Sequence, residues 1–272
     1  MRSFFRRNTH IPRTPIDVVI TDFDSTLTIA QPNTVPDEVW KALRAWKAQG
    51  NTLILATGRT LPYLVGPSGI DDPAKLRIFD MIVAENGAVM WDPHADRVTL
   101  LADPPSPLLV DRLRAALGGD LTVGYGCISA PKTRTSDIEA VLGQVSADLN
   151  RIFGTTSVMY VPRGVSKLSG IRHALRELNI HPSRCATIGD GENDHDMLDR
   201  SATPFGMTVA VQNAEPATQK LAQYVTVSEK GYGVMELLSA LLARNAHHRP
   251  RLPFLHRSPA HQPQTEVPEL TV

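Results

Sequence analysis

Short runs of apolar residues alternate with amphipathic segments in the first third of the chain. The run at residues 18–20 consists of β-branched side chains, which predicts a strand buried on both faces. Residues 31–50 follow with apolar positions at helical spacing on one face. Further short, mostly apolar runs at residues 52–56 and 81–84 predict two more strands. This order of elements is typical of a parallel sheet with covering helices.

The pattern changes after residue 87, where short strands, turns and helices are mixed. Such a mixture indicates an α+β unit with an antiparallel sheet. Residues 88–163 are therefore interpreted as an insert into the parallel-sheet domain. The predicted elements of the insert are two short strands around a turn (88–101), a helix (105–119), a strand (121–129), a helix (135–150) and a strand (157–161).

The first pattern resumes with an amphipathic helix at residues 166–180, after which strands and helices alternate again. The sequence thus predicts an α/β fold whose Rossmann-like parallel-sheet core carries helices on both faces. We assign this core to residues 16–87 and 164–244, so that the α+β insert divides it.

The two ends of the chain lack this periodicity. Residues 1–15 are basic and have no apolar stretch of the kind found in secretory signals, so we interpret them as a flexible leader. A fragment of a transit peptide is the alternative interpretation of this segment. Residues 245–272 are rich in proline and predict a disordered tail. The tail holds four of the nine histidines, but not at the fixed spacing of a metal site.

Composition narrows the possible classes of protein. The chain has 272 residues, 42% of them hydrophobic, and a formal net charge of zero, which gives no indication of nucleic-acid or membrane partners. No apolar run approaches the roughly 18 residues of a membrane helix. Cys127 and Cys185 are the only cysteines, which is too few for a disulfide framework. We therefore expect a reducing compartment and a cytoplasmic location.

Carboxylates follow the first predicted strand at its end. Asp22 and Asp24 are two residues apart, so in an extended chain their side chains point the same way. Ligands bind beyond the carboxyl ends of the strands in open parallel sheets. Two carboxylates about 4 Å apart repel by roughly 4 kcal/mol at an effective dielectric constant near 20. A cation between them, a shared proton or a proton held for transfer would relieve this repulsion.

Polar residues also end other predicted strands. Thr57 follows the second strand, Asp190 and Asp194 follow a later one, and Lys167 begins a helix. Each has a structural interpretation as a turn, capping or surface residue. Together they match a phosphoryl-transfer site, because a carboxylate can act as nucleophile, Asp oxygens suit Mg²⁺, and an ammonium neutralises phosphoryl oxygens.

Two other kinds of site are excluded by spacing. The acidic run that begins at Asp190 fails as an EF-hand, because its sixth position is His195 rather than Gly and its twelfth is Ser201 rather than Glu. The glycine-rich fingerprints of P-loop and dinucleotide-binding folds are missing from the sequence.

In these residues the chain resembles the haloacid dehalogenase superfamily, and specifically its Cof-type branch, also called subclass IIB. Four family motifs occur in order, and the resemblance covers roughly residues 16–243. Ser25 stands where the family commonly has Gly, which is a minor departure. The matching segments are Asp22-Phe23-Asp24-Ser25-Thr26, Thr57-Gly58-Arg59, Lys167, Gly189-Asp190-Gly191-Glu192-Asn193-Asp194, the further signature Glu85-Asn86-Gly87-Ala88, and VAVQNA at 209–214.

The resemblance implies catalytic roles for five residues. Asp22 attacks phosphorus and forms an aspartyl-phosphate, and Asp24 protonates the leaving oxygen. Asp24 then takes a proton from the water that hydrolyses the intermediate. Thr57, Gly58 through its amide, and Lys167 hold the phosphoryl oxygens.

The resemblance also implies a magnesium site. Its expected ligands are Asp22, the backbone carbonyl of Asp24, and Asp190, with Asp194 supporting the metal directly or through water. Asn193 is expected to help order the site and the bound phosphate.

The resemblance identifies the insert at residues 88–163 as a cap that excludes water and selects the leaving group. It is short for this branch, and its size is similar to that of archaeal phosphoglycolate phosphatases and sucrose-phosphatase relatives. Lys132, Arg134 and Arg163 are candidates for contact with an anionic substrate, or else solvated surface residues.

The sequence therefore predicts a Mg²⁺-dependent phosphatase that hydrolyses a small phosphorylated metabolite, such as a sugar phosphate or a phosphoglycolate-like compound. One alternative is a phosphomutase resembling phosphomannomutases, which share these motifs. The other is a non-catalytic, phospho-accepting module, against which Asp24 argues because a receiver needs no general acid.

Overall fold

The structure is a computed structural model that describes residues 15–29, 34–66, 69–70, 72–145, 147–154, 156–199, 201 and 203–248. The predicted leader, apart from Pro15, lies outside the described residues, and so does the tail from residue 249 onward.

The described residues form two β-sheets. The larger has eight strands in the order β12-β11-β10-β1-β2-β3-β4-β5, and the smaller has four in the order β6-β7-β9-β8. The strands are β1 (Val18–Thr21), β2 (Thr52–Ala56), β3 (Met81–Ala84), β4 (Val89–Asp92), β5 (Arg97–Leu100), β6 (Thr122–Val123), β7 (Ile128–Pro131), β8 (Leu149–Phe153), β9 (Ser157–Pro162), β10 (Cys185–Gly189), β11 (Met207–Ala210) and β12 (Tyr224–Val225).

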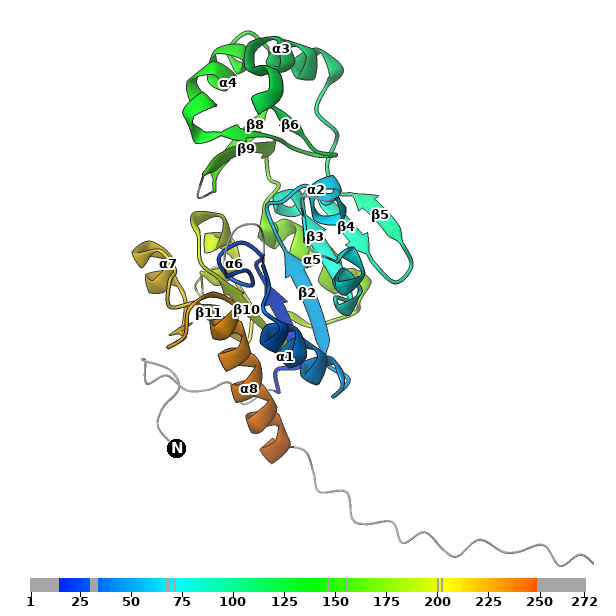
Figure 1. The fold of residues 1–272 in the computed structure, drawn as a ribbon, viewed down its shortest axis with the longest axis vertical. Coiled ribbons are helices and arrows are strands. Elements are labelled where there is room, and N and C mark those ends of the chain that lie inside the picture. Colours follow the sequence, from blue (N-terminus) through cyan, green and yellow to red (C-terminus); the bar gives the residue numbers. More distant parts are fainter. Residues whose placement is uncertain are drawn as a thin grey trace, which may run out of the picture.

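Helices cover both faces of the larger sheet, while the smaller sheet sits above its edge (Figure 1). The predicted α/β class, with a mostly parallel sheet and a separate α+β part, is confirmed. The helices are α1 (Asp37–Lys47), α2 (Leu61–Val65), α3 (Pro107–Leu117), α4 (Thr135–Leu142), α5 (Lys167–Glu177), α6 (His195–Leu198), α7 (Pro216–Leu221) and α8 (Lys230–His248).

The central strand β1 is buried on both faces, as its run of β-branched residues predicts. Val19 packs in one apolar cluster with residues of α1 and α8. Val18 and Ile20 point the other way and pack with residues of α5 and α6. β1 pairs in parallel with β10 on one side and β2 on the other, so the ends of these strands meet at one edge.

The predicted start of the insert at residue 88 is wrong. β4 pairs antiparallel with β3, and β5 with β4, so this hairpin extends the large sheet rather than the small one. The chain reverses at Glu85, Asn86 and Gly87, which all have positive φ angles and return β4 alongside β3. We use "cap" below for residues 107–162, from the start of α3 to the end of β9.

Inside the cap, α3 and α4 pack on one face of the small antiparallel sheet through an apolar cluster of their own. Two predicted elements are wrong here. Residues 121–129 form not one strand but β6 and the start of β7, which pair with each other across a turn. The predicted helix 135–150 ends at Leu142, and β8 follows from Leu149.

The C-terminal helix α8 extends beyond the predicted start of the tail at residue 245 and ends at His248. Asn245 anchors it, since its Nδ2 donates to the carbonyl oxygen of Ile16 at 2.7 Å. Within the described part of the chain, no helix combines the length and the apolar character needed to cross a membrane.

Candidate active site

The site residues come directly after neighbouring parallel strands. Asp22 follows β1 and its backbone N–H donates to Ile188 O of β10 at 3.0 Å. Thr57 follows β2 and its N–H donates to Val83 O of β3 at 2.8 Å. Asp190 follows β10. The regular pairing of the sheet therefore continues up to the predicted site residues, which fixes where they lie.

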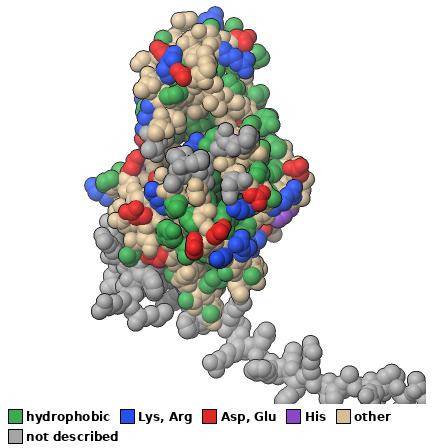
Figure 2. Space-filling view, viewed as in Figure 1, with side chains coloured by type: hydrophobic (Ala, Val, Ile, Leu, Met, Phe, Trp, Pro, Cys, Tyr) green, Lys and Arg blue, Asp and Glu red, His purple; other side chains and the backbone are tan. Residues whose placement is uncertain are grey.

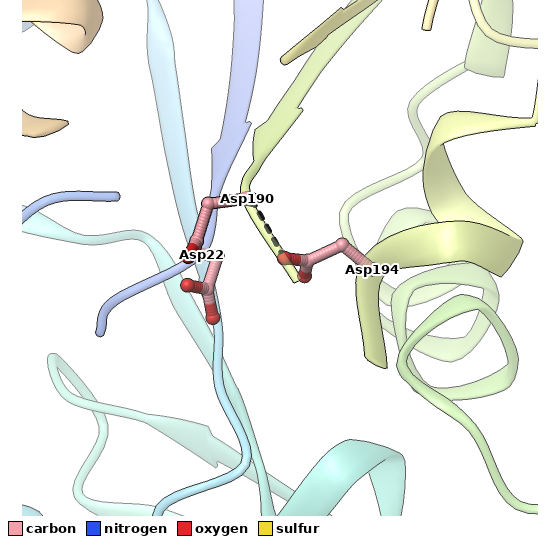
Figure 3. Close-up of side chains that lie close together, drawn as sticks. All are labelled: Asp22, Asp190 and Asp194. Atoms are coloured by element: carbon pink, nitrogen blue, oxygen red, sulfur yellow. Dashed lines mark hydrogen bonds between the residues drawn. The ribbon is translucent and has the colours of Figure 1, made fainter. Parts of the chain in front are cut away.

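Three carboxylates converge at this edge of the sheet (Figure 3). Asp22, Asp190 and Asp194 each offer an oxygen, and these oxygens lie within 4.8 Å of one another. Asp22 and Asp194 are buried, and Asp190 is partly buried. We call these three residues the acidic triad.

Lys167 is the cation that faces the acidic triad. Its side chain is fully buried, and Nζ donates to Oδ1 of Asp22 at 2.5 Å and to Oδ1 of Asp194 at 2.7 Å. Lys167 is the first residue of α5, and the capping box formed by Ser166 and Ser169 fixes the start of that helix. The bond from Lys167 to Asp22 holds the N-terminal end of α5 beside the end of β1.

The remaining oxygens of the acidic triad are also held. Oδ2 of Asp194 accepts from the backbone N–H groups of Asp190 at 2.9 Å and Gly191 at 3.1 Å. Oδ1 of Asp190 accepts from Thr26 Oγ1 at 2.8 Å. The Thr26 bond ties the loop after β10 to the loop after β1, and the two Asp194 bonds order the loop after β10 itself. The carboxylates are therefore positioned before any ligand arrives.

The electrostatics of the acidic triad favour a further cation. Burial raises the pKa of Asp22 well above its usual range, although Lys167 acts to lower it. Burial and the neighbouring Asp194 raise the pKa of Asp190 to about 7. Burial acts to lower the pKa of Lys167, but Asp194 and Asp22 outweigh it and the pKa is raised. One ammonium thus faces three carboxylates, and this all-oxygen donor set fits a hard divalent cation such as Mg²⁺.

Asp24 lies apart from the acidic triad and pairs with Arg59. The Arg59 guanidinium donates through Nε to both carboxylate oxygens, at 3.0 and 2.9 Å, and through Nη2 to Oδ1 at 2.6 Å. The same guanidinium stacks 4.6 Å from the ring centre of Tyr63. The backbone N–H of Arg59 donates to Thr57 Oγ1 at 3.0 Å. In the sequence Arg59 belongs to the Thr57-Gly58-Arg59 motif, but nothing in the sequence signals its pairing with Asp24.

The cap reaches the predicted phosphate-binding residues. Thr57 is buried, and a Cβ atom on Gly58 would lie 3.2 Å from Asn86 Oδ1 and 3.3 Å from Met159 Sδ. Asn193 donates to the same Asn86 oxygen at 3.4 Å, and Asn86 Nδ2 contacts the Met159 sulfur at 3.1 Å. Because Met159 lies in β9, the cap meets the core at Gly58, a contact that periodicity in the sequence does not reveal.

Comparison with known protein families decides the family of this chain. The profile of the haloacid dehalogenase-like hydrolases matches residues 19–112 and 131–238, which is most of the sequence. The chain belongs to this family. The predicted superfamily and the predicted enzyme class, a hydrolase, are confirmed, and we refer to the protein below as the hydrolase.

Curated relatives and solved structures agree with this assignment. A phosphoglycolate phosphatase of Haloarcula marismortui is 28% identical over 231 residues, covering 81% of this chain and 95% of that protein. Another, of Pyrobaculum islandicum, is 25% identical and covers 84% and 97%.

Among solved structures, a HAD/COF-like hydrolase from Plasmodium vivax has a TM-score of 0.70 at 18% identity, covering 86% of this chain and 97% of that one. A sugar phosphatase of HAD subclass IIB has a TM-score of 0.61 at 18% identity, covering 84% and 99%. The fold of the hydrolase is therefore that of the predicted Cof-type branch.

The three basic residues that the sequence singled out for substrate contact all contact residues of the cap. On the face drawn in Figure 2, charges of both signs are interspersed over the cap and the core, in keeping with the zero net charge. Lys132 lies 5.5 Å from the ring centre of Phe153, Arg134 pairs with Asp120 at 2.6 Å and Asp137 at 2.7 Å, and Arg163 pairs with Asp148 at 2.5 Å.

The departure at Ser25 has a structural counterpart. Ser25 has a φ angle of 56°, in the left-handed region where glycine is favoured. Its N–H donates to Thr28 Oγ1 at 3.1 Å, and its carbonyl accepts from Asn213 Nδ2 at 3.0 Å. These two bonds hold the turn between Asp24 and Thr26 in a conformation that the hydrolase would otherwise reach most readily with glycine.

Proposed function

We propose that the hydrolase is a Mg²⁺-dependent phosphatase that hydrolyses a small phosphorylated metabolite through an aspartyl-phosphate on Asp22. The observation that carries this proposal is the buried group formed by the acidic triad and Lys167, with Asp24 two residues after Asp22 in the chain and bonded to Arg59. It lies at the carboxyl edge of a parallel sheet, where substrates bind in such folds.

The acidic triad supports the choice of metal. Asp22, Asp190 and Asp194 would hold Mg²⁺ together with the backbone carbonyl of Asp24, and Asp194 acts directly or through water. When bound, the ion would neutralise charge on the phosphoryl oxygens. Thr26 and the backbone of residues 190–191 hold the carboxylates in place for it.

The chemical step uses two carboxylates in different roles. An oxygen of Asp22 attacks phosphorus, the bond from phosphorus to the leaving oxygen breaks, and Asp24 gives its proton to that oxygen. A water molecule then attacks the phosphorus of the aspartyl-phosphate while Asp24 takes a proton from it. Phosphate leaves, and both carboxylates return to their starting states. The two residues have different partners, since Asp22 accepts from Lys167 and Asp24 pairs with Arg59, so each is held separately for its own step.

The remaining predicted residues would hold the transferred group. Lys167 and the Thr57 hydroxyl would contact the equatorial oxygens together with the amide of Gly58, and they are positioned by α5 and the end of β2. Asn193 would order this side of the site through its bond to Asn86.

We propose that the substrate is a phosphoglycolate-like compound or a sugar phosphate. Relatives at 28% identity over most of the chain are named phosphoglycolate phosphatases, and one structural neighbour is named a sugar phosphatase. Contact between Met159 of the cap and the Gly58 loop supports a site that is closed on its leaving-group side and takes small substrates.

A panel assay tests the proposal. Purified full-length protein is incubated with Mg²⁺ and phosphorylated metabolites, including 2-phosphoglycolate and hexose phosphates, and free phosphate is measured without any added bisphosphate. Release of phosphate is expected. If the protein instead isomerises a sugar phosphate, needs an added bisphosphate to do so and releases no free phosphate, it is a mutase. If it forms a stable phosphoprotein without turnover, it is a phospho-accepting module.

A further inference from the structure

Glu85 and Asn86 form an unusual junction between the core and the cap. Both side chains are buried, and both residues have positive φ angles, 56° and 50°, although neither is glycine. Non-glycine residues keep this conformation only where surrounding contacts impose it. The contacts of Glu85 and Asn86 should therefore show which interactions hold the backbone in this conformation.

The backbone of this junction is bonded to the predicted phosphate-binding loop. The N–H of Glu85 donates to Arg59 O at 3.0 Å, and the N–H of Asn86 donates to Thr57 O at 3.0 Å. These two bonds connect the junction to the residues on both sides of Gly58.

The side chain of Glu85 is bonded to the cap. Its Oε2 accepts from the N–H of Gly126 at 2.8 Å, and its Oε1 accepts from the N–H of Tyr125 at 3.1 Å and from Leu61 N–H of the core at 3.3 Å. Among the described residues, Glu85 takes part in no ion pair. Its buried carboxylate is held by backbone N–H groups that come from both sides of the junction.

The two sides of the contact are packed too closely for extra side-chain atoms. A Cβ atom on Gly124 would lie 2.4 Å from Glu85 Oε2, and one on Gly126 would lie 2.6 Å from Ala88 Cβ. The absence of side chains at Gly124 and Gly126 therefore lets this segment approach closely, so that the N–H groups of Tyr125 and Gly126 reach the carboxylate.

We propose that Glu85 is a positioning residue that clasps residues 124–126 of the cap and holds the cap in register with the Thr57–Arg59 loop. The catalytic role of this clasp rests on the proposed phosphatase function, but the contact between Glu85 and the cap does not depend on that function. The clasp would set the opening above the site, so it affects substrates whose leaving group meets the cap. It leaves the acidic triad and Lys167 untouched.

Two variants break the clasp from opposite sides. Glu85→Gln keeps the shape but turns one acceptor oxygen into an N–H₂ donor that faces backbone donors. Gly124→Ala places a methyl group against the carboxylate. Gly119→Ala is the matched control, because a Cβ atom there meets nothing within 4 Å.

Amide hydrogen exchange of the full-length protein is the first measurement. In both clasp variants the amides of Tyr125 and Gly126 should lose protection by at least about tenfold, while those of β2 stay protected. Unchanged protection of Tyr125 and Gly126, or an equal loss throughout the core, would overturn the proposal.

Kinetics give the second measurement. Relative to wild type, each clasp variant should lower kcat/KM for a phosphorylated metabolite about tenfold more than for p-nitrophenyl phosphate. Equal losses on both substrates would contradict a positioning role. If the wild-type protein releases no phosphate from any substrate while the exchange result holds, the proposed function fails and the clasp stands.

Discussion

The ammonium of Lys167 donates to Oδ1 of Asp22 at 2.5 Å and is fully enclosed by protein. A second bond, at 2.7 Å, joins it to Asp194. Removing one partner from a buried ion pair leaves an uncompensated charge, which costs much more than the loss of a surface pair. Lys167 therefore has a structural effect that can be measured apart from catalysis.

Lys167→Gln should lower the free energy of unfolding by about 3–5 kcal/mol in the presence of a chelator. Asp22 and Asp194 would face each other without their shared cation. Denaturant titration measures the change, and Arg97→Gln is the control, because Arg97 pairs with Glu177 at the exposed surface and should cost under about 1 kcal/mol. A loss of similar size in both variants would show that the buried ion pairs of Lys167 contribute no more to stability than a surface ion pair.

In the presence of a chelator, the free energy of unfolding of Asp22→Asn should be equal to or higher than that of wild type. Burial raises the pKa of Asp22, so the folded protein disfavours its charge, and Lys167 keeps Asp194 as a partner. Asp17→Asn is a control in the segment before β1, since Asp17 pairs with Arg184 at the surface. A drop of more than about 2 kcal/mol for Asp22→Asn alone would mean that its charge stabilises the fold.

Arg59→Gln should slow the hydrolysis of alkyl phosphates more than that of p-nitrophenyl phosphate. Arg59 orients the Asp24 carboxylate by three hydrogen bonds, and proton donation matters most when the leaving group is a poor one. We expect a difference of about tenfold between the two substrate classes. Arg59→Lys keeps the charge without the forked geometry and should fall between. Equal effects on both classes would show that Arg59 does not orient Asp24 for proton donation.

Gly87→Ala should destabilise the hydrolase by more than about 3 kcal/mol. Gly87 has a φ angle of +100°, and a Cβ atom there would lie 2.0 Å from the carbonyl oxygen of Ser166, the capping residue before Lys167.

Two other glycine positions serve as controls that distinguish the effect of backbone strain from that of the contact between Gly87 and Ser166. Gly50→Ala has a positive φ but free space and should cost about 1–2 kcal/mol, while Gly119→Ala should be neutral. If thermal melting ranks Gly50→Ala as equally harmful, backbone strain rather than the close approach of α5 explains Gly87.

The parallel core could be predicted because its strands are buried on both faces. Residues 18–20 and 53–56 are continuous apolar runs, and residues 166–180 show a helical repeat. In each case the burial that stabilises the element also marks the sequence.

The cap was less predictable because its strands are short and partly exposed. β8 (Leu149–Phe153) carries Asn150 and Arg151 at its centre, so its residues continue the polar pattern of the preceding helix. Its strand conformation comes from pairing with β9, which lies outside any local window. The hairpin of β4 and β5 looks like part of the insert for the same reason, since its pairing with β3 decides its sheet.

The site shows the same division. The acidic triad and Lys167 could be predicted because each residue ends a strand or begins a helix within a recognisable motif. The Arg59 contact with Asp24 and the Glu85 contact with Gly126 join segments that are distant in the chain. Neither contact leaves a periodic pattern, so both required the structure.

The most direct test of the account is the initial rate of phosphate release, measured for wild type and Asp22→Asn with Mg²⁺ and with excess chelator. On a substrate that the wild type hydrolyses, we predict release with Mg²⁺ and none with chelator. Asp22→Asn should remain folded and release none in either condition. Full activity in chelator, or turnover by Asp22→Asn within about tenfold of wild type, a barrier change near 1.4 kcal/mol, would contradict a magnesium-dependent attack by Asp22.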